Sequence, residues 1–139
     1  MSTIVRIGSS PFVANLFTFT FKHVTGANEP SVGDVVSLNS SGDAQKVTAD
    51  GERAVGVVVS KSGGYVVVCM HGIVEVVAGG SISVGDRVYP AAGGKVKALG
   101  AAPATYTPSY HDSQNAVIGI ALTSAAAADD KLIVALEVV

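Results

Sequence analysis

The sequence lacks the features that would let it bind a charged polymer, cross a membrane or rely on disulfides. Among its 139 residues there are one cysteine and no tryptophan, and only 14% of the residues are charged. Nine basic and eleven acidic side chains leave no basic stripe for phosphate groups, so we expect no nucleic acid as a partner. No apolar run approaches the length of a membrane span, about 18 residues, and the first residues lack the apolar stretch of a secretory signal. We therefore expect no membrane partner and no disulfide within the chain.

Valine dominates what the chain does contain, in a pattern with a period of two. In residues 65–77 the even positions are all apolar or glycine, while the odd positions mix apolar and polar side chains. Residues 131–139 repeat this arrangement, with leucine and valine on one face. Such alternation, rich in β-branched residues, predicts strands that place one face on a core.

Two parts of the chain resemble each other. Ser-Val-Gly-Asp-Val-Val at 31–36 returns as Ser-Val-Gly-Asp-Arg-Val at 83–88, and Ala-Val-Gly-Val-Val at 54–58 returns as Val-Ile-Gly-Ile-Ala at 117–121. Each Gly-Asp pair predicts a tight turn between strands. The repeat therefore predicts an all-β fold, a small barrel or sandwich made of two related Gly-Asp-turn strand units.

We expect one β domain over residues 29–139, with pseudo-repeats at 30–78 and 82–139. The insertion at 100–114 should form an extended surface loop, and residues 124–130 should form one helical turn with Ser124 as the N-cap. Helix elsewhere should be close to none. Residues 1–28 are predicted to be an N-terminal arm with a Phe/Thr strand that holds all four phenylalanines of the chain. That strand either adds to the sheet edge of a partner or is the first strand of the domain's own sheet.

The search for catalytic groups finds one weak candidate. Cys69, His71 and Glu75 would share a strand face, but a thiolate nucleophile needs a basic neighbour and an exposed cleft. A buried structural cysteine is the simpler interpretation. Adding His111 supplies too few ligands for structural zinc, and the aspartates of the Gly-Asp turns are explained by those turns. We expect no enzyme activity, no metal and no cofactor.

The mixed face of residues 65–77 is too apolar to lie in water. It predicts an oligomer interface formed by Tyr65, Val67, Ile73 and Val77. A second class of function stays open at this point. The same strands would also suit a small binding module with a β-clip or barrel cleft, in which the 100–114 loop and its two tyrosines hold a sugar or a peptide.

The order of these motifs resembles the small capsid decoration, or cement, proteins of tailed bacteriophages. The resemblance covers most of the chain from about Glu29 onward and depends on order and spacing. It rests on Gly-Asp-Val-Val at 33–36, Ala-Val-Gly-Val-Val at 54–58, the Val-rich strand at 66–76 that ends in Gly-Ile-Val-Glu-Val, and Val-Gly-Asp-Arg-Val-Tyr at 84–89, followed by residues 117–121 and 132–138.

The resemblance implies a β-tulip or barrel-like fold with an extended N-terminal arm. It implies a homotrimer that binds the outer surface of a phage capsid in the virion, after assembly in the bacterial host cytoplasm, and stabilises neighbouring copies of the major capsid protein. It transfers no catalytic residue. Deleting residues 2–21 should abolish binding to shells and leave a folded oligomer. The arm residues expected to bind the capsid are Ile4, Val5, Arg6, Phe12, Phe17, Phe19 and Phe21.

Overall fold

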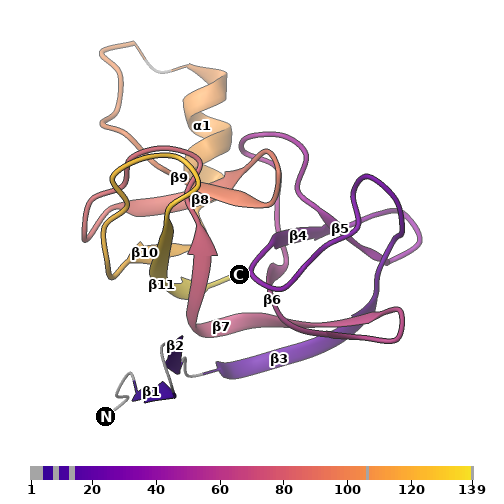
Figure 1. The fold of residues 1–139 in the computed structure, drawn as a ribbon. Coiled ribbons are helices and arrows are strands. Elements are labelled where there is room, and N and C mark those ends of the chain that lie inside the picture. The colour runs from indigo at the N-terminus through magenta and orange to yellow at the C-terminus, as the bar shows by residue number, and fades with distance from the viewer. Residues whose placement is uncertain (1–4, 8–9, 13–14, 106, 139) are drawn as a thin grey trace.

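The computed structural model describes residues 5–7, 10–12, 15–105 and 107–138 (Figure 1). Within this part of the chain there are eleven strands and one short helix. The elements in chain order are β1 (Val5–Ile7), β2 (Ser10–Phe12), β3 (Asn15–Lys22), β4 (Val35–Leu38), β5 (Ala44–Lys46), β6 (Gly56–Ser62), β7 (Tyr65–Val77), β8 (Arg87–Ala91), β9 (Lys95–Ala98), α1 (Pro108–Asn115), β10 (Gly119–Ala121) and β11 (Lys131–Glu137).

Nine strands form one curled sheet. Its order is β5-β4-β6-β7-β11-β10-β8-β9, with β3 joined to β7 beside this path, while β1 and β2 form a separate hairpin. The sheet is symmetric about its centre. On one side β7 is followed outward by β6, β4 and β5, and on the other side β11 is followed by β10, β8 and β9, so the two halves have equivalent strand orders. This confirms the predicted all-β fold of two related strand units.

The two units repeat the same hydrogen bonds at their Gly-Asp turns. The Ser31 N–H donates to the Asp34 carboxylate at 2.8 Å, and the Ser83 N–H donates to the Asp86 carboxylate at 2.9 Å. Each aspartate therefore closes its own turn, which accounts for both carboxylates without any catalytic role. The next strand is joined by equivalent backbone hydrogen bonds, from Gly33 N–H to Val58 C=O and from Gly85 N–H to Ala121 C=O.

A glycine begins both β6 and β10, where two backbones come very close. A Cβ on Gly56 would lie 2.2 Å from the backbone oxygen of Cys69, and a Cβ on Gly119 would lie 2.2 Å from that of Ala135. Only glycine fits at such a distance. These contacts also align the two units, so that Gly56 corresponds to Gly119 and Cys69 to Ala135.

Strand β7 belongs to both units. Its first half pairs with β6 and β3, its second half pairs with β11, and Figure 1 shows the strand turning between the two halves. Buried Gly72, with φ +147°, lies in this region. Strand β3 thus holds in the first unit the place that residues 71–77 hold in the second. Each of these segments is followed by a residue that forms a parallel bridge. In the first unit His23 pairs with Ala44 of β5, and in the second unit Ala78 pairs with Val96 of β9.

The hydrophobic core is built from the faces that the alternation predicts. Four of the even positions of β7 are at most 1% exposed, and Leu132, Val134 and Leu136 of β11 are at most 4% exposed. One large cluster joins the second unit to one side of the first. A smaller cluster fills the first unit and consists of Val36, Ala44, Val58, Val66 and Val68, with Phe21 and Val55 packed against it.

The insertion at 100–114 is not the extended loop that we predicted, because its second half forms α1. The Thr107 side chain accepts a hydrogen bond from Tyr110 N–H at 3.2 Å, and Pro108 occupies the first helical turn. A threonine N-cap followed by proline is a helix start signal, and it outweighs the low helix propensity of the polar residues that follow. No α1 side chain is buried, so the helix adds little to the core.

The helical turn predicted for residues 124–130 is also wrong, because that segment follows an irregular turn. Ser124 does not cap a helix. The Asp130 carboxylate accepts the N–H groups of Ala126 and Ala127, both at 3.1 Å, and Ala125 forms an antiparallel bridge with Ile82. The bridge at Ala125 and the Asp130 hydrogen bonds hold the alanines in an irregular turn where their propensity favours helix, so tertiary pairing decides the conformation.

The Phe/Thr strand is the first strand of the domain's own sheet, one of the two alternatives that the sequence left open. Strand β3 pairs with β7 in an antiparallel register from Asn15–Gly72 to Lys22–Tyr65, with irregularities near Phe17. A deletion meant to remove only an arm must therefore stop before β3.

Candidate functional site

Exposed apolar side chains mark the surfaces on which a second molecule would bind. Eight large apolar residues among those described are at least 38% exposed: Phe17, Phe19, Val32, Leu38, Tyr65, Val84, Ile120 and Leu122. They belong to several strands and turns of both units. Exposed apolar side chains are thus present on both units.

The phenylalanines of β3 form the most aromatic of these surfaces. The Phe17 and Phe19 ring centroids lie 6.0 Å apart and those of Phe19 and Phe21 lie 5.9 Å apart, both in tilted contacts. Phe21 is half-buried against the small core cluster, whereas Phe17 and Phe19 are 50% and 56% exposed. A shallow hollow of about 290 Å³ beside Phe17 is also lined by Met70, His71 and Val138.

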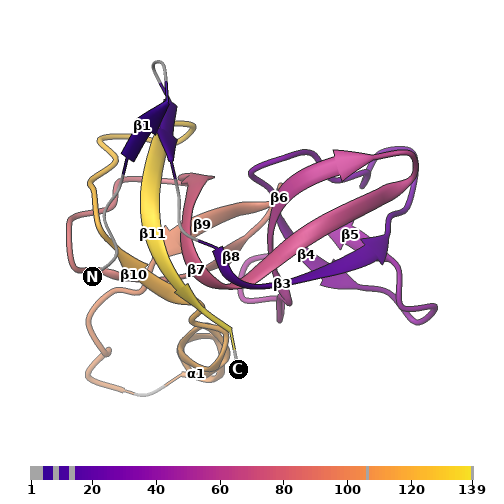
Figure 2. The same cartoon turned by 90° about the horizontal axis from the view of Figure 1, so that it is seen from below.

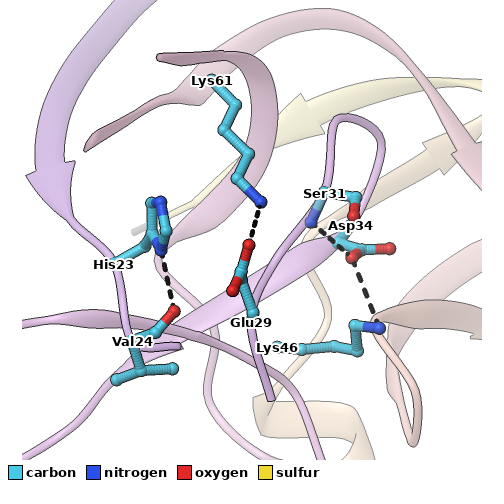
Figure 3. Close-up of polar contacts among 7 residues, drawn as sticks. All are labelled: His23, Val24, Glu29, Ser31, Asp34, Lys46 and Lys61. Carbon is cyan, nitrogen blue, oxygen red and sulfur yellow. Dashed lines mark hydrogen bonds and ion pairs between the residues drawn. The ribbon is translucent and has the colours of Figure 1, made fainter. Parts of the chain in front are cut away.

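Polar contacts fix the chain just after β3 (Figure 3). The His23 Nδ1–H donates to the Val24 carbonyl at 2.7 Å, and Lys61 Nζ lies 2.6 Å from the Glu29 carboxylate. The Lys61 ammonium lowers the pKa of Glu29 by a hydrogen bond and by its charge. The Lys61–Glu29 pair thus ties the loop between β3 and β4 to β6.

The predicted capsid-binding residues fall into two groups. Ile4 lies outside the described residues, Val5 and Arg6 are in β1, and Phe12 is in β2. Val5 pairs with Phe12 in the β1–β2 hairpin, a separate two-stranded sheet that lies below β11 in Figure 1 and in front of it in Figure 2. The remaining three are the β3 phenylalanines described above. The structure thus separates a hairpin from the aromatic surface of the sheet.

The four predicted interface residues lie in β7, two in each half of the strand. Tyr65 is 54% exposed and begins the first half of β7, together with half-buried Val67. Half-buried Ile73 and Val77 lie in the second half, beyond the turn of the strand in Figure 1. The glycine within the valine run was the sequence signal for this bend, because an interior strand glycine often marks one.

The side chains considered for catalysis are not assembled into a site. The Cys69 side chain is 0% exposed and its thiol donates to the backbone carbonyl of His71 at 3.1 Å. Burial raises the pKa of this thiol, which keeps it protonated. His111 lies on α1, at the far end of the molecule from the first half of β7 in Figure 1. Among the described residues no three His, Cys, Asp or Glu side chains gather as metal ligands.

Cys69 is expected to react with a thiol reagent at least about 100-fold more slowly in the folded protein than in urea, since reaction requires an opening that costs about 3 kcal/mol or more. A time course with a chromogenic disulfide, in buffer and in denaturant, measures the ratio. Free peptide cysteine in the same buffer is the control. Equal rates in both solvents would show that the thiol is accessible, contrary to its position in the core.

A polar hollow of about 520 Å³ lies between α1 and β8, and its lining includes Asp50, Tyr89 and Tyr110. Asp50 is already engaged, because it accepts Ala92 N–H at 2.9 Å and pairs with Lys97 at 2.7 Å. These partners lower the pKa of Asp50, the Lys97 hydrogen bond most of all. Tyr106, the other tyrosine of the insertion, lies outside the described residues.

The fold and these surfaces define a class: a small β protein whose described residues present contact surfaces and no assembled catalytic group. The family model for phage cement proteins matches residues 58–136, more than half of the chain. The chain therefore belongs to the phage cement protein family. Proteins of this family are structural proteins associated with the phage capsid and in general are not enzymes, so the location of this chain is the virion.

The fold is also similar to a solved phage structure. The crystal structure of the head fiber gp8.5 N base in bacteriophage phi29 matches with a TM-score of 0.55, over 91% of this chain and 95% of that chain, at 17% sequence identity. At this identity the likeness concerns the fold. No curated protein matches the sequence significantly, and no finding supports the alternative of a sugar- or peptide-binding module. The described residues contain no helix long and apolar enough to span a membrane.

Proposed function

We propose that this protein binds the outer surface of an assembled phage head as a homotrimer and cements neighbouring copies of the major capsid protein. The observation that carries the proposal is the match of residues 58–136 to the phage cement protein family. The distribution of exposed apolar residues supports it, because contact surfaces on a rigid sheet suit a protein that acts by binding alone. A trimer that attaches at several points gains effective concentration with each attachment.

Residues 1–14 and the exposed Phe17 at the start of β3 are proposed to contact the shell, in keeping with the N-terminal arm that the resemblance implies. The β1–β2 hairpin is separate from the nine-stranded sheet and precedes β3 in the chain. A separate hairpin followed by an exposed aromatic side chain would bury apolar area on the capsid without disturbing the core.

The direct test mixes the purified protein with expanded empty heads and images them by electron cryomicroscopy. We expect additional density on the outer surface at three-fold and quasi-three-fold positions, and decorated heads that withstand higher temperature than bare heads. Sedimentation of the free protein should give the mass of three chains. Bare heads at saturating protein, or a free monomer, would contradict the proposal. Heads incubated with heat-unfolded protein are the control.

A further inference from the structure

Corresponding positions of the two units differ in exposure on one side of the first unit. Phe19 pairs with β7 as Val74 pairs with β11, yet Val74 is 0% exposed and Phe19 is 56% exposed. Leu38 of β4 is 38% exposed, whereas Pro90 at the corresponding place in β8 is buried. The following turn repeats the difference, since Gly42 is exposed where Gly94 is buried. We call Phe19, Leu38 and Gly42 the open face.

The second unit shows the opposite difference on its other side. Val57 is 0% exposed and its counterpart Ile120 is 47% exposed. Val35 is 0% exposed, and its counterpart Arg87 is exposed. Leu122, at 39% exposure, corresponds to half-buried Val59. We call Arg87, Ile120 and Leu122 the outer face.

Within the chain, the first unit covers the second unit through the counterparts of these two faces. The counterparts of the outer face are Val35 and Val57 in the first unit, and the counterpart of the open face is around Val74 in the second unit. Val35 and Val57 belong to the same core cluster as Val74. Backbone hydrogen bonds hold this contact, because Val35 N–H donates to Gly94 C=O at 2.9 Å and Gly94 N–H donates to Val47 C=O at 3.1 Å. One chain thus contains one complete contact of this kind, and one unused surface at each end of it.

We infer that the outer face of one copy binds the open face of the next copy and so repeats the contact between the two units. The inference rests on the proposed homotrimer and names the surfaces that form it. The two surfaces of each contact are different, so the association is head-to-tail and gives a closed ring when its rotation permits. Three copies in such a ring leave neither face exposed, so this inference assigns Phe19 to the contact between copies and not to the shell.

Two further observations favour this pairing. One observation concerns Val32, which lines a hollow together with Val59 and Val74–Val77 at the contact between the units, so its exposed counterpart Val84 (66%) lies beside the outer face and adds apolar area to it. Arg87 stands where Val35 contacts Gly94, and Gly94 corresponds to Gly42, which Asp43 follows. The contact therefore brings a guanidinium of one copy to a carboxylate of the next.

Phe19→Asp and Ile120→Asp test the two faces separately. Both side chains are about half exposed, so each variant should fold, which circular dichroism checks. We expect each substitution to lower the trimer association constant at least about 30-fold, the effect of losing one hot-spot residue. Ala102→Asp is the control, because it places the same charge on an exposed residue of the 100–114 insertion, which has no counterpart in the first unit, and it should sediment as a trimer.

Mixing the two variants tests the head-to-tail geometry. Phe19→Asp keeps an intact outer face and Ile120→Asp keeps an intact open face, so the mixture should contain a dimer of one chain of each in native mass spectrometry. Trimers of both single variants, or no mixed dimer, would overturn the inference and leave the proposed trimer in place. A monomeric wild type would instead contradict the proposed function itself.

Discussion

Replacing Gly56 or Gly119 by alanine is expected to cost about 3 kcal/mol of folding free energy each. The new methyl group would lie 2.2 Å from the backbone oxygen of Cys69 or Ala135, and a backbone oxygen in the middle of a sheet cannot move aside without breaking the ladder. The two losses together come to about 6 kcal/mol, close to the low end of the roughly 5–15 kcal/mol by which small domains are usually stable, so the double variant should have a much lower urea midpoint than either single variant. Urea unfolding followed by circular dichroism measures the loss.

Gly80→Ala is the matched control for these substitutions. No heavy atom lies within 4 Å of a Cβ at Gly80, and its φ is not in the left-handed region. Its free energy of unfolding should change by less than about 0.5 kcal/mol. If Gly56→Ala and Gly119→Ala unfold at the same urea concentration as the control, the close approach of the two backbones is not real.

Removing residues 2–14 and removing residues 2–21 are expected to give different proteins. The shorter deletion leaves β3 intact, so the chain should fold and associate while its binding to phage heads falls to background. The longer deletion removes most of β3, which pairs with β7 and packs Phe21 against the small core cluster. We expect that chain to lose cooperative unfolding, because Val66 and Val68 become exposed.

Co-sedimentation with empty heads and thermal melting together separate the two outcomes. The full-length chain at the same concentration is the reference for both measurements. Undiminished sedimentation of the shorter chain with heads would mean that residues 2–14 do not bind the capsid. A sharp melting transition in the longer deletion would mean that β3 contributes little to the fold.

The parts of the fold that the sequence predicted depend on local chemistry. The Gly-Asp turns close through their own aspartates, so Asp34 and Asp86 identify two equivalent units from four-residue patterns. The alternation in β7 and β11 predicted which valines and leucines are buried. The cysteine was correctly read as a core residue because burial is the usual state of that side chain.

The errors concern segments in which two local tendencies compete. The Thr107-Pro108 pair starts α1 inside a stretch that we predicted as a loop. The prediction followed the proline- and alanine-rich composition of the stretch and did not weigh this single helix-capping signal. The alanines at 125–128 favour helix, but the bridge between Ala125 and Ile82 holds them in an irregular turn.

By itself, the sequence determined that this protein is a valine-rich β fold of two related units, because period-two burial and turn closure act over a few neighbouring residues. Only the tertiary structure decided that β3 joins the domain's own sheet and that one unit covers the other in an asymmetric way. Which strand edges meet, and which corresponding side chains stay exposed, depends on contacts between residues far apart in the chain. Phe19 and Val74 occupy equivalent positions, and their exposures of 56% and 0% differ because the rest of the fold covers only Val74.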